Sequence, residues 1–165
     1  MGLIFALDPG TRRLGLAVGN RDRVLWALGI DLGRARTPAD VATVVAEAWP
    51  VAYRRDFEFG TLVAEWPQVR DRFRVAEDVI NDMREVVVCV ETAAPWARRR
   101  RIPPEAWKGQ VPKPVHQTRI ERELAVGEAT AINWSALSPD GRDAVGILLW
   151  ASGRLKGIRK PKRLP

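Results

Sequence analysis

The sequence predicts an α/β domain built on a mixed five-stranded sheet with helices on its faces. Near the start, three short apolar runs are separated only by tight turns, which is typical of an antiparallel meander. Two further strand candidates each follow a stretch with helical periodicity, and a well-capped helix lies near the end. The predicted order of three strands, helix, strand, helix, strand and two helices favours a mixed sheet covered by helices.

The first three predicted strands lie at residues 3–8, 14–19 and 23–30, where apolar residues run together. A Pro-Gly pair at residues 9–10 suits a sharp turn after the first strand, and the polar residues 20–22 suit a second turn. The three strands are therefore predicted to be neighbours along the chain and in the sheet.

A helix is predicted to begin after Thr37, and a strand is predicted at residues 61–66. Thr37 can cap the helix, Pro38 suits its first position, and Asp40 complements the helix dipole in the first turn. An apolar stripe at helical spacing follows, formed by Val41, Val44, Val45 and Ala48.

Residues 74–95 contain a valine-rich run that resembles a strand by composition, but the longer pattern predicts one long helix. Apolar residues recur every three or four positions with acidic residues between them. A short strand is predicted at residues 98–102, and Pro103 and Pro104 end it.

Two helices are predicted in the last third of the chain, one at residues 114–125 and one that begins after the capping residue Ser138. The chain then ends in a basic stretch rich in proline, which favours disorder. The predicted division is a domain at residues 1–153 and a tail at residues 154–165.

The chain has 165 residues, a length that fits one domain with a proper core. Its formal net charge is +7, and 22 of its 27 basic residues are arginine. This balance favours a polyanionic partner, most simply nucleic acid, although codon bias is an alternative source of arginine.

The single cysteine, Cys89, excludes an intrachain disulfide and a cysteine-rich zinc site. A chain of this kind is typical of a reducing compartment, so we expect a cytoplasmic protein. The first apolar run is too short for a signal sequence or a membrane span, and Asp8 interrupts it. We expect neither a membrane partner nor a small-molecule cofactor.

Four carboxylates lie where catalytic chemistry would require them. Asp8 ends the first predicted strand, Glu65 lies near the end of the fourth, and Asp140 and Asp143 are three residues apart on the last helix. A spacing of three places two side chains on one helix face. If that helix turn packs against the strand ends, the four acids converge, and converging carboxylates need a cation.

Oxygen-only ligands favour Mg²⁺ or Mn²⁺, and two such ions about 4 Å apart are the usual device for phosphodiester hydrolysis. Each acid also has a structural interpretation. Asp8 suits a turn, Asp140 complements the helix dipole, and Asp143 could pair with a nearby arginine. Glu65 is the hardest to explain structurally, because unpaired acids are rare within buried runs.

Four motifs occur in the order LDPGTRRLGLAV, VAEWPQV, PPEAWKGQVPK and PDGRDAVGILLW. Together they resemble the RuvC-type Holliday junction resolvases, most closely the small bacteriophage forms. The resemblance extends over about residues 3–152. It implies a ribonuclease H-like, retroviral-integrase-like fold, and a homodimer that cuts four-way DNA junctions with divalent metal, two ions per active site.

The resemblance also implies roles for particular residues. Asp8, Glu65, Asp140 and Asp143 match the four catalytic, metal-binding acids of the family. Lys108 and Lys113 match two functional lysines near the scissile phosphate, where Lys108 would stabilise developing charge. The long helix at residues 74–95 would lie at the dimer interface, so Val86, Val87 and Val90 could face a partner subunit.

Other basic and aromatic residues are candidate DNA contacts. Arg12 and Arg13 follow the first turn and would meet the substrate backbone, and Arg100 lies in a basic strand that either contacts phosphate or is solvated. Phe73 is a candidate junction wedge, with core packing as the alternative. The loop between Lys108 and Lys113 is shorter than in cellular members, which leaves any cleavage-sequence preference open.

Three further polar residues are not assigned to the candidate site. On a helix, Glu91 would face away from the valine stripe or toward a partner. Asp31 would lie far from the end of the sheet that carries Asp8. His116, the only histidine, is interpreted as a solvated residue rather than a general base.

Two other functions compete with junction cleavage. The opening motif is as close to the YqgF-type proteins, which implies a nuclease acting on structured RNA. A non-cleaving, basic junction-binding module is the other alternative, although all four acids are present.

Overall fold

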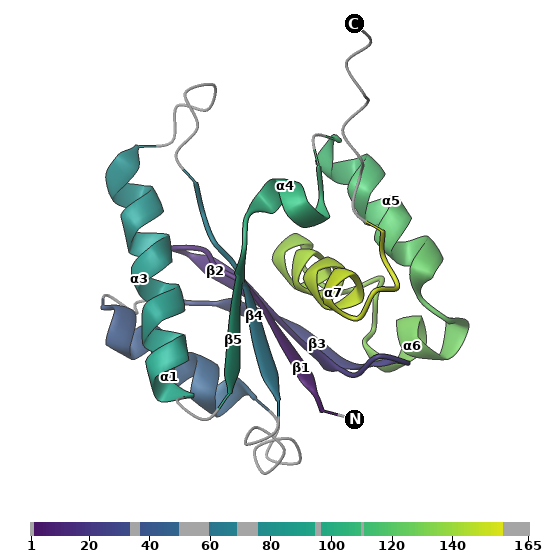
Figure 1. The fold of residues 1–165 in the computed structure, drawn as a ribbon, viewed down its shortest axis with the longest axis horizontal. Coiled ribbons are helices and arrows are strands. Elements are labelled where there is room, and N and C mark those ends of the chain that lie inside the picture. Colours follow the sequence, from purple (N-terminus) through teal and green to yellow (C-terminus); the bar gives the residue numbers. More distant parts are fainter. Residues whose placement is uncertain are drawn as a thin grey trace, which may run out of the picture.

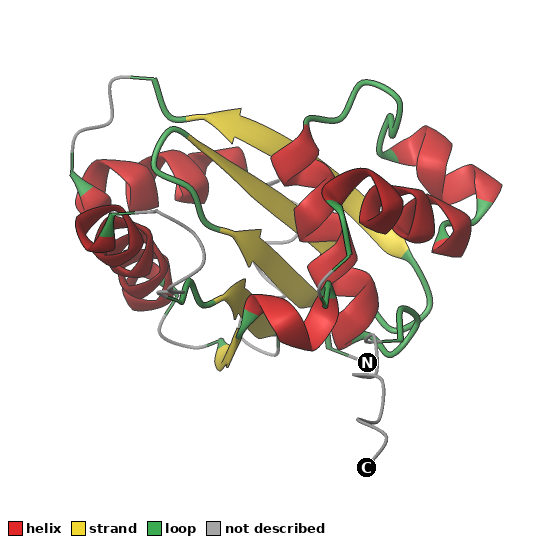
Figure 2. Cartoon of the chain, turned by 90° about the horizontal axis from the view of Figure 1, so that it is seen from above, coloured by secondary structure: helices red, strands yellow, loops and turns green. Residues whose placement is uncertain are grey.

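A computed structural model describes residues 2–33, 37–49, 60–68, 76–94, 97–109 and 111–156. It contains a five-stranded sheet in the order β3-β2-β1-β4-β5, with helices on both faces (Figures 1 and 2). The predicted mixed five-stranded α/β architecture is therefore confirmed. The strands are β1 (Ile4–Asp8), β2 (Arg13–Gly19), β3 (Val24–Asp31), β4 (Thr61–Glu65) and β5 (Arg98–Ile102).

The strand directions decide which residues meet at each edge of the sheet. β2 is antiparallel to both β1 and β3, whereas β4 is parallel to β1 and β5 is parallel to β4. β1, β3, β4 and β5 therefore end at the same edge, where β2 begins. This edge carries Asp8, Asp31 and Glu65.

Six described helices cover the two faces. One face carries α1 (Pro38–Ala48) and α3 (Glu77–Ala93), and the other carries α7 (Pro139–Ala151) with the smaller helices around it (Figures 1 and 2). The smaller helices are α4 (Pro104–Trp107), α5 (Lys113–Glu123) and α6 (Val126–Ala131). Because strand side chains alternate between faces, each face has its own apolar core.

The two cores differ in the size of the strand side chains. Phe5, Leu7 and Leu62 face α1 and α3, whereas Ala6 and Ala17 face α7. Small residues on the α7 side let this helix lie close to the sheet. Its own apolar face supplies the bulk of that core, together with the fully buried Trp107.

The valine-rich segment is helical, as its periodicity predicts, because α3 includes it throughout. Val86, Val87 and Val90 are nevertheless buried in the core beside α1, so the prediction that they face a partner subunit is wrong. The short helices α4 and α6 were not predicted, and the strand predicted at residues 61–66 ends one residue earlier.

The predicted tail begins at residue 154, yet Arg154 and Leu155 are part of the fold. Leu155 is buried, and the guanidinium of Arg154 donates two hydrogen bonds of 2.6 Å to the carboxylate of Glu128. Glu128 also accepts the backbone N–H groups of Val24 and Ala125. The clasp formed by Glu128 and Arg154 thus fixes the end of the domain to the β2–β3 turn; residues 157–165 lie outside the described residues.

Every described helix is too short or too polar to cross a membrane.

Candidate active site

The first turn of α7 is held directly against the sheet. Ser138 caps the helix by accepting the N–H of Gly141 at 3.2 Å. Gly15, which pairs with Asp8 across β1 and β2, lies under this turn. A Cβ atom at Gly15 would lie 1.9 Å from the carbonyl oxygen of Asp140, so a side chain there would push the helix away. The absence of a side chain at Gly15 is what brings α7 beside the end of β1.

Asp8 is half-buried and lies among charges from four elements. Burial raises the pKa of the Asp8 carboxyl well above its usual range, and the carboxylates of Glu65 and Asp143 raise it further. The ammonium groups of Lys108 and Lys113 act in the opposite direction. The site therefore gathers like charges and partly balances them with lysines.

Glu65 is buried at the end of β4, with 8% of its surface exposed. Its Oε2 accepts the indole N–H of Trp107 at 2.7 Å and lies 3.0 Å from the ammonium nitrogen of Lys108. Burial alone would lower the pKa of Lys108, but the carboxylates of Glu65, Asp8 and Asp143 outweigh it and raise that pKa. α4, which places Trp107 and Lys108, thus fixes both the orientation and the charge balance of Glu65.

Lys113, at the start of α5, pairs with the acids of α7. Its Nζ lies 2.9 Å from Oδ2 of Asp143 and 3.9 Å from Oδ1 of Asp140. The other oxygen of Asp143, Oδ1, is buried and has no hydrogen-bond partner among the described residues. Buried carboxylate oxygens normally have a partner, so this oxygen is suited to receive a further donor or a cation.

The donor set fits a hard divalent cation. Asp8, Glu65, Asp140 and Asp143 offer only oxygen ligands, two of the carboxylates are buried, and one oxygen of Asp143 has no hydrogen-bond partner in the described part of the chain. Among the described residues, no three His, Cys, Asp or Glu side chains stand ready to hold a metal ion. The ammonium groups of Lys108 and Lys113 hold Glu65 and Asp143 in ion pairs instead.

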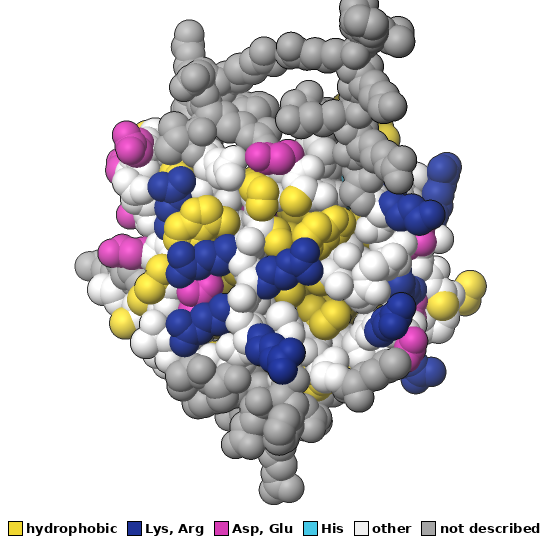
Figure 3. Space-filling model, in the orientation of Figure 1, with side chains coloured by type: hydrophobic (Ala, Val, Ile, Leu, Met, Phe, Trp, Pro, Cys, Tyr) yellow, Lys and Arg dark blue, Asp and Glu magenta, His cyan; other side chains and the backbone are white. Residues whose placement is uncertain are grey.

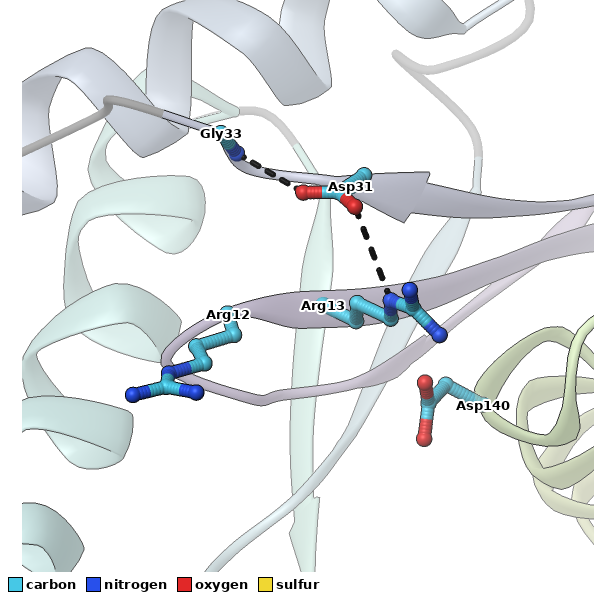
Figure 4. A pocket seen from close by; sticks show the side chains of 5 residues that line it. All are labelled: Arg12, Arg13, Asp31, Gly33 and Asp140. Carbon is cyan, nitrogen blue, oxygen red and sulfur yellow. Dashed lines mark hydrogen bonds and ion pairs between the residues drawn. The ribbon is translucent and has the colours of Figure 1, made fainter.

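Asp31 lies at the same edge of the sheet as Asp8, so the prediction that it lies far away is wrong. The reason is topological, because β3 and β1 run in the same direction on either side of β2. Asp31 pairs with Arg13 at 3.6 Å. Both line a cavity of about 500 Å³ together with Arg12, Gly33 and Asp140. Figure 4 shows Arg13 reaching toward Asp31 near Asp140, whereas Arg12 points away from them.

Asp140 therefore has a different position from the other three acids. Its carboxylate borders the cavity of Arg12 and Arg13, whereas the acids that raise the pKa of Asp8 are Glu65 and Asp143. The structure thus brings Asp8, Glu65 and Asp143 together with both lysines, and it leaves Asp140 on the flank that leads to Arg13.

The remaining predicted contact residues lie elsewhere. Arg100 is exposed on the edge strand β5, where its guanidinium lies 4.5 Å from the ring centroid of Trp150. Phe73 lies outside the described residues. Glu91 is buried and accepts two hydrogen bonds from Arg101, at 2.9 and 2.6 Å, so it faces neither solvent nor a partner. Its exclusion from the candidate site holds, but for a different reason.

His116 and Trp107 form a buried pair that the sequence did not reveal. The prediction that His116 is solvated is wrong, since 1% of its surface is exposed and its ring packs edge-on against Trp107 at 4.8 Å. Burial lowers the pKa of His116 to about 4, although the charge of Asp143 opposes this shift. The only signal in the sequence is the position of Trp107 immediately before Lys108.

No protein-family model and no curated protein sequence matches the chain. Two solved structures of Thermus thermophilus RuvC have the same fold. The first, RuvC in complex with a Holliday junction substrate, gives a TM-score of 0.62 at 17% identity and covers 96% of this chain and 100% of that one. The second, RuvC alone, gives a TM-score of 0.59 at 17% identity over 94% of this chain and 99% of that one. The chain therefore has a RuvC-like, ribonuclease H-like fold.

Proposed function

We propose that the chain is a divalent-metal-dependent endonuclease that cuts four-way and other branched DNA junctions. The observation that carries the proposal is the cluster of Asp8, Glu65 and Asp143 with Lys108 and Lys113 at one edge of a RuvC-like sheet. One of the two Thermus neighbours was solved with a Holliday junction substrate, which supports the choice of substrate. The motif resemblance supports the further proposal of a relation to the small bacteriophage forms.

The proposed metal ligands are Asp8, Glu65, Asp140 and Asp143, holding Mg²⁺ or Mn²⁺, with two ions per site. Bound ions of this kind supply an activated water and stabilise the leaving oxygen in phosphodiester hydrolysis. Trp107 holds one oxygen of Glu65, and Lys113 holds one oxygen of Asp143. These contacts limit how each carboxylate can turn toward a cation.

The lysines are proposed to act on the phosphate. Lys108 and Lys113 pair with Glu65 and Asp143, so a phosphate bound at these acids would lie near both ammonium groups, which would stabilise charge that develops on it. Arg12 and Arg13 are proposed to hold the DNA backbone next to the site, because both are exposed and line the cavity that Asp140 borders. Arg100 is proposed as a more distant backbone contact.

Symmetric cutting of a four-way junction requires two active sites, so we propose a homodimer acting in the cytoplasm of a bacterial or phage-infected cell. The outward face of α3 offers a surface for this, since Val88 is 41% exposed there. The oligomeric state is measurable by light scattering of the purified protein.

The proposed function is tested with a synthetic four-way junction, incubated with the protein in Mg²⁺ or Mn²⁺ and beside a linear duplex of the same sequence. We expect paired nicks in the junction and an intact duplex. Asp8→Asn and Asp143→Asn should abolish cutting while junction binding persists. As a matched control, Asp22→Asn removes an exposed acid at the opposite edge of the sheet and should leave cutting unchanged.

Two other results would reject junction cleavage, and a third would reject only the proposed acids. Cutting of structured RNA but not of the junction would favour the YqgF-type function. Tight, salt-sensitive junction binding without cleavage in any metal would favour a non-cleaving module. Full cutting by Asp8→Asn would exclude the proposed acid cluster.

A further inference from the structure

Strand β5 presents four consecutive arginines at the open edge of the sheet. Its residues Arg98 to Arg101 are all exposed, and β5 pairs with β4 on one side only. Figure 3, drawn in the orientation of Figure 1, shows Lys and Arg side chains gathered over this edge. A row of cations on an edge strand is either protection against strand pairing or a binding surface.

The four arginines are not equivalent, because one of them is neutralised. Arg101 pairs with the buried Glu91 through two hydrogen bonds and lies 4.1 Å from the ring centroid of Trp66. Arg100 lies against Trp150 on the other face of the strand. Arg98, Arg99 and Arg100 form no ion pair with any acid in the described part of the chain. We call these three residues the β5 row.

The β5 row leads away from the edge of the sheet that carries the candidate active site. Ile102 pairs with Glu65 across the two parallel strands, and Arg98 pairs with Thr61 at the other end. At about 3.3 Å per residue, the row starts roughly 7 Å from the end of the strand and extends about 7 Å further. Beyond Ile102 the chain leads directly into α4, which carries Lys108. A polyanion held at the site could therefore continue along this edge.

Acidic residues on the neighbouring helix α3 indicate on which side of β5 a polyanion can bind. The exposed acids of α3 are Glu77, Asp78, Asp82 and Glu85. They lie to the α3 side of β5, where Figure 3 shows acidic side chains. A polyanion is therefore favoured along β5 and toward α4 and α7, and it is disfavoured across α3.

Edge protection alone does not require this arrangement. Charged side chains on an edge strand discourage strand pairing, but a run of arginines without acids also concentrates positive charge that a bound polyanion would relieve. Arginine also binds phosphate through two parallel hydrogen bonds, which suits it to a nucleic-acid backbone.

We propose that Arg98, Arg99 and Arg100 bind the phosphate backbone of a DNA duplex arm that extends from the active site. The proposal rests on the proposed function for the identity of the polyanion, but it does not depend on cleavage. On this proposal the β5 row increases the affinity for DNA by contacting a longer part of the arm, and it takes no part in the chemical step.

The test compares two triple variants that lose the same charge. The first is Arg98→Gln, Arg99→Gln and Arg100→Gln. The matched control is Arg21→Gln, Arg23→Gln and Arg122→Gln, whose residues are exposed but lie outside this edge. Circular dichroism and thermal unfolding establish that each variant is folded. The single variant Arg98→Glu, on the same strand face as Arg100, provides a second measurement should the triple variant not fold.

Binding is measured by fluorescence anisotropy in EDTA, with four-way junctions whose arms are shortened stepwise, at several salt concentrations. For the β5-row variant we expect the slope of log K against log salt to become less negative by about two to three, since each phosphate contact contributes about 0.9. The control variant should keep the wild-type slope. Shortening the arms should lower the affinity of the wild-type protein for the junction until it equals that of the β5-row variant. The affinity of the variant should not depend on arm length.

Equal affinity and equal salt slope for the wild type and the β5-row variant would overturn the proposal and leave edge protection as the role of the row. An equal loss in both triple variants would also overturn it, because the effect would then reflect net charge alone. Since no metal is present, a protein that never cleaves DNA can still pass or fail this test.

Discussion

Two carboxylates in this molecule, Glu128 and Asp8, have opposite environments. Glu128 accepts two hydrogen bonds from Arg154 and one each from the backbone N–H groups of Val24 and Ala125. Burial alone would raise its pKa, but these donors outweigh burial and lower it to about 2. Asp8 instead faces Glu65 and Asp143, and burial and these charges raise its pKa.

The difference separates a carboxylate that stabilises the fold from one that does not. The charge of Glu128 is favourable to the folded state, whereas the charge of Asp8 is unfavourable without an added cation. A folded protein retains an unfavourable charge at a sheet edge only where another requirement outweighs stability. Substituting the two residues should therefore change stability in opposite directions.

The largest expected effect is that of Asp8→Asn on cleavage. The amide removes a proposed metal ligand, so we expect the cleavage rate to fall by about 10³-fold or more, which corresponds to about 4 kcal/mol. In EDTA at neutral pH the same variant should unfold at a higher temperature than the wild type, because one repelling charge is gone. Thermal unfolding followed by circular dichroism, beside a single-turnover cleavage assay, checks both statements. A lower unfolding temperature would contradict the assignment of Asp8.

The stability that Asp8→Asn gains should depend on pH, because the pKa of Asp8 is raised in the folded protein. The folded state binds the Asp8 proton more tightly than the unfolded state, so the penalty is complete above the raised pKa. The penalty disappears as pH falls to about 4, the ordinary pKa of aspartate. The stability curves of Asp8→Asn and the wild type should therefore converge in acid.

Gly15→Ala should move α7 away from β1 and so separate Asp143 from Asp8. A Cβ atom would lie 1.9 Å from a backbone oxygen, and we expect the free energy of unfolding to fall by about 3 kcal/mol or more. Cleavage should fall with it. The matched control is Gly127→Ala, where the added atom meets nothing within 4 Å, and its stability should stay within about 1 kcal/mol of the wild type. Urea unfolding measures both variants.

Glu128→Gln should have the opposite sign to Asp8→Asn. It leaves Arg154 without its carboxylate, and we expect a loss of about 3 kcal/mol at neutral pH. Because the folded pKa of Glu128 is lowered to about 2, its stabilisation is complete above the ordinary value of about 4.3 and is lost as pH falls toward 2. Urea unfolding from pH 7 to pH 2 should show the variant and the wild type converging, with the exposed Glu121→Gln as the control. A constant difference across this range would contradict the role given to the clasp.

The smallest expected effect on stability is that of Trp107→Phe, which keeps most of the ring and removes the N–H donor to Glu65. We expect a loss of about 2 kcal/mol in stability. Because Trp107 orients a proposed ligand, Mn²⁺ affinity measured by calorimetry without DNA should fall by about tenfold or more. Trp134→Phe alters another buried tryptophan of the same core that no described carboxylate contacts, and it should leave Mn²⁺ affinity unchanged. Equal Mn²⁺ affinity in the two variants would show that Trp107 only fills space.

Local patterns in the sequence were enough to predict most of the architecture. The meander, α1 and α7 follow from turn residues and caps, and the helical period of α3 outweighs its strand-like composition. The helices α4 and α6 were missed because they have six residues or fewer, too few for a periodic pattern.

The sequence could not reveal contacts that depend on strand direction or on burial. Asp31 was misplaced because its position depends on β1 and β3 running parallel, which no local pattern encodes. The burial of His116 and the pairing of Glu91 with Arg101 join elements that fold together only through tertiary packing. The pairing of each lysine with its own carboxylate was hidden for the same reason.

The ion pairs of Lys108 with Glu65 and of Lys113 with Asp143 mean that the protein carries its own counterions. Two of the crowded acids are therefore paired with an ammonium group without any metal ion. A divalent ion would then enter by exchange with ammonium groups that are already bound. If the chain binds the proposed ions, folding and metal loading would be separate events, and the lysines would leave their acids as the ions bind.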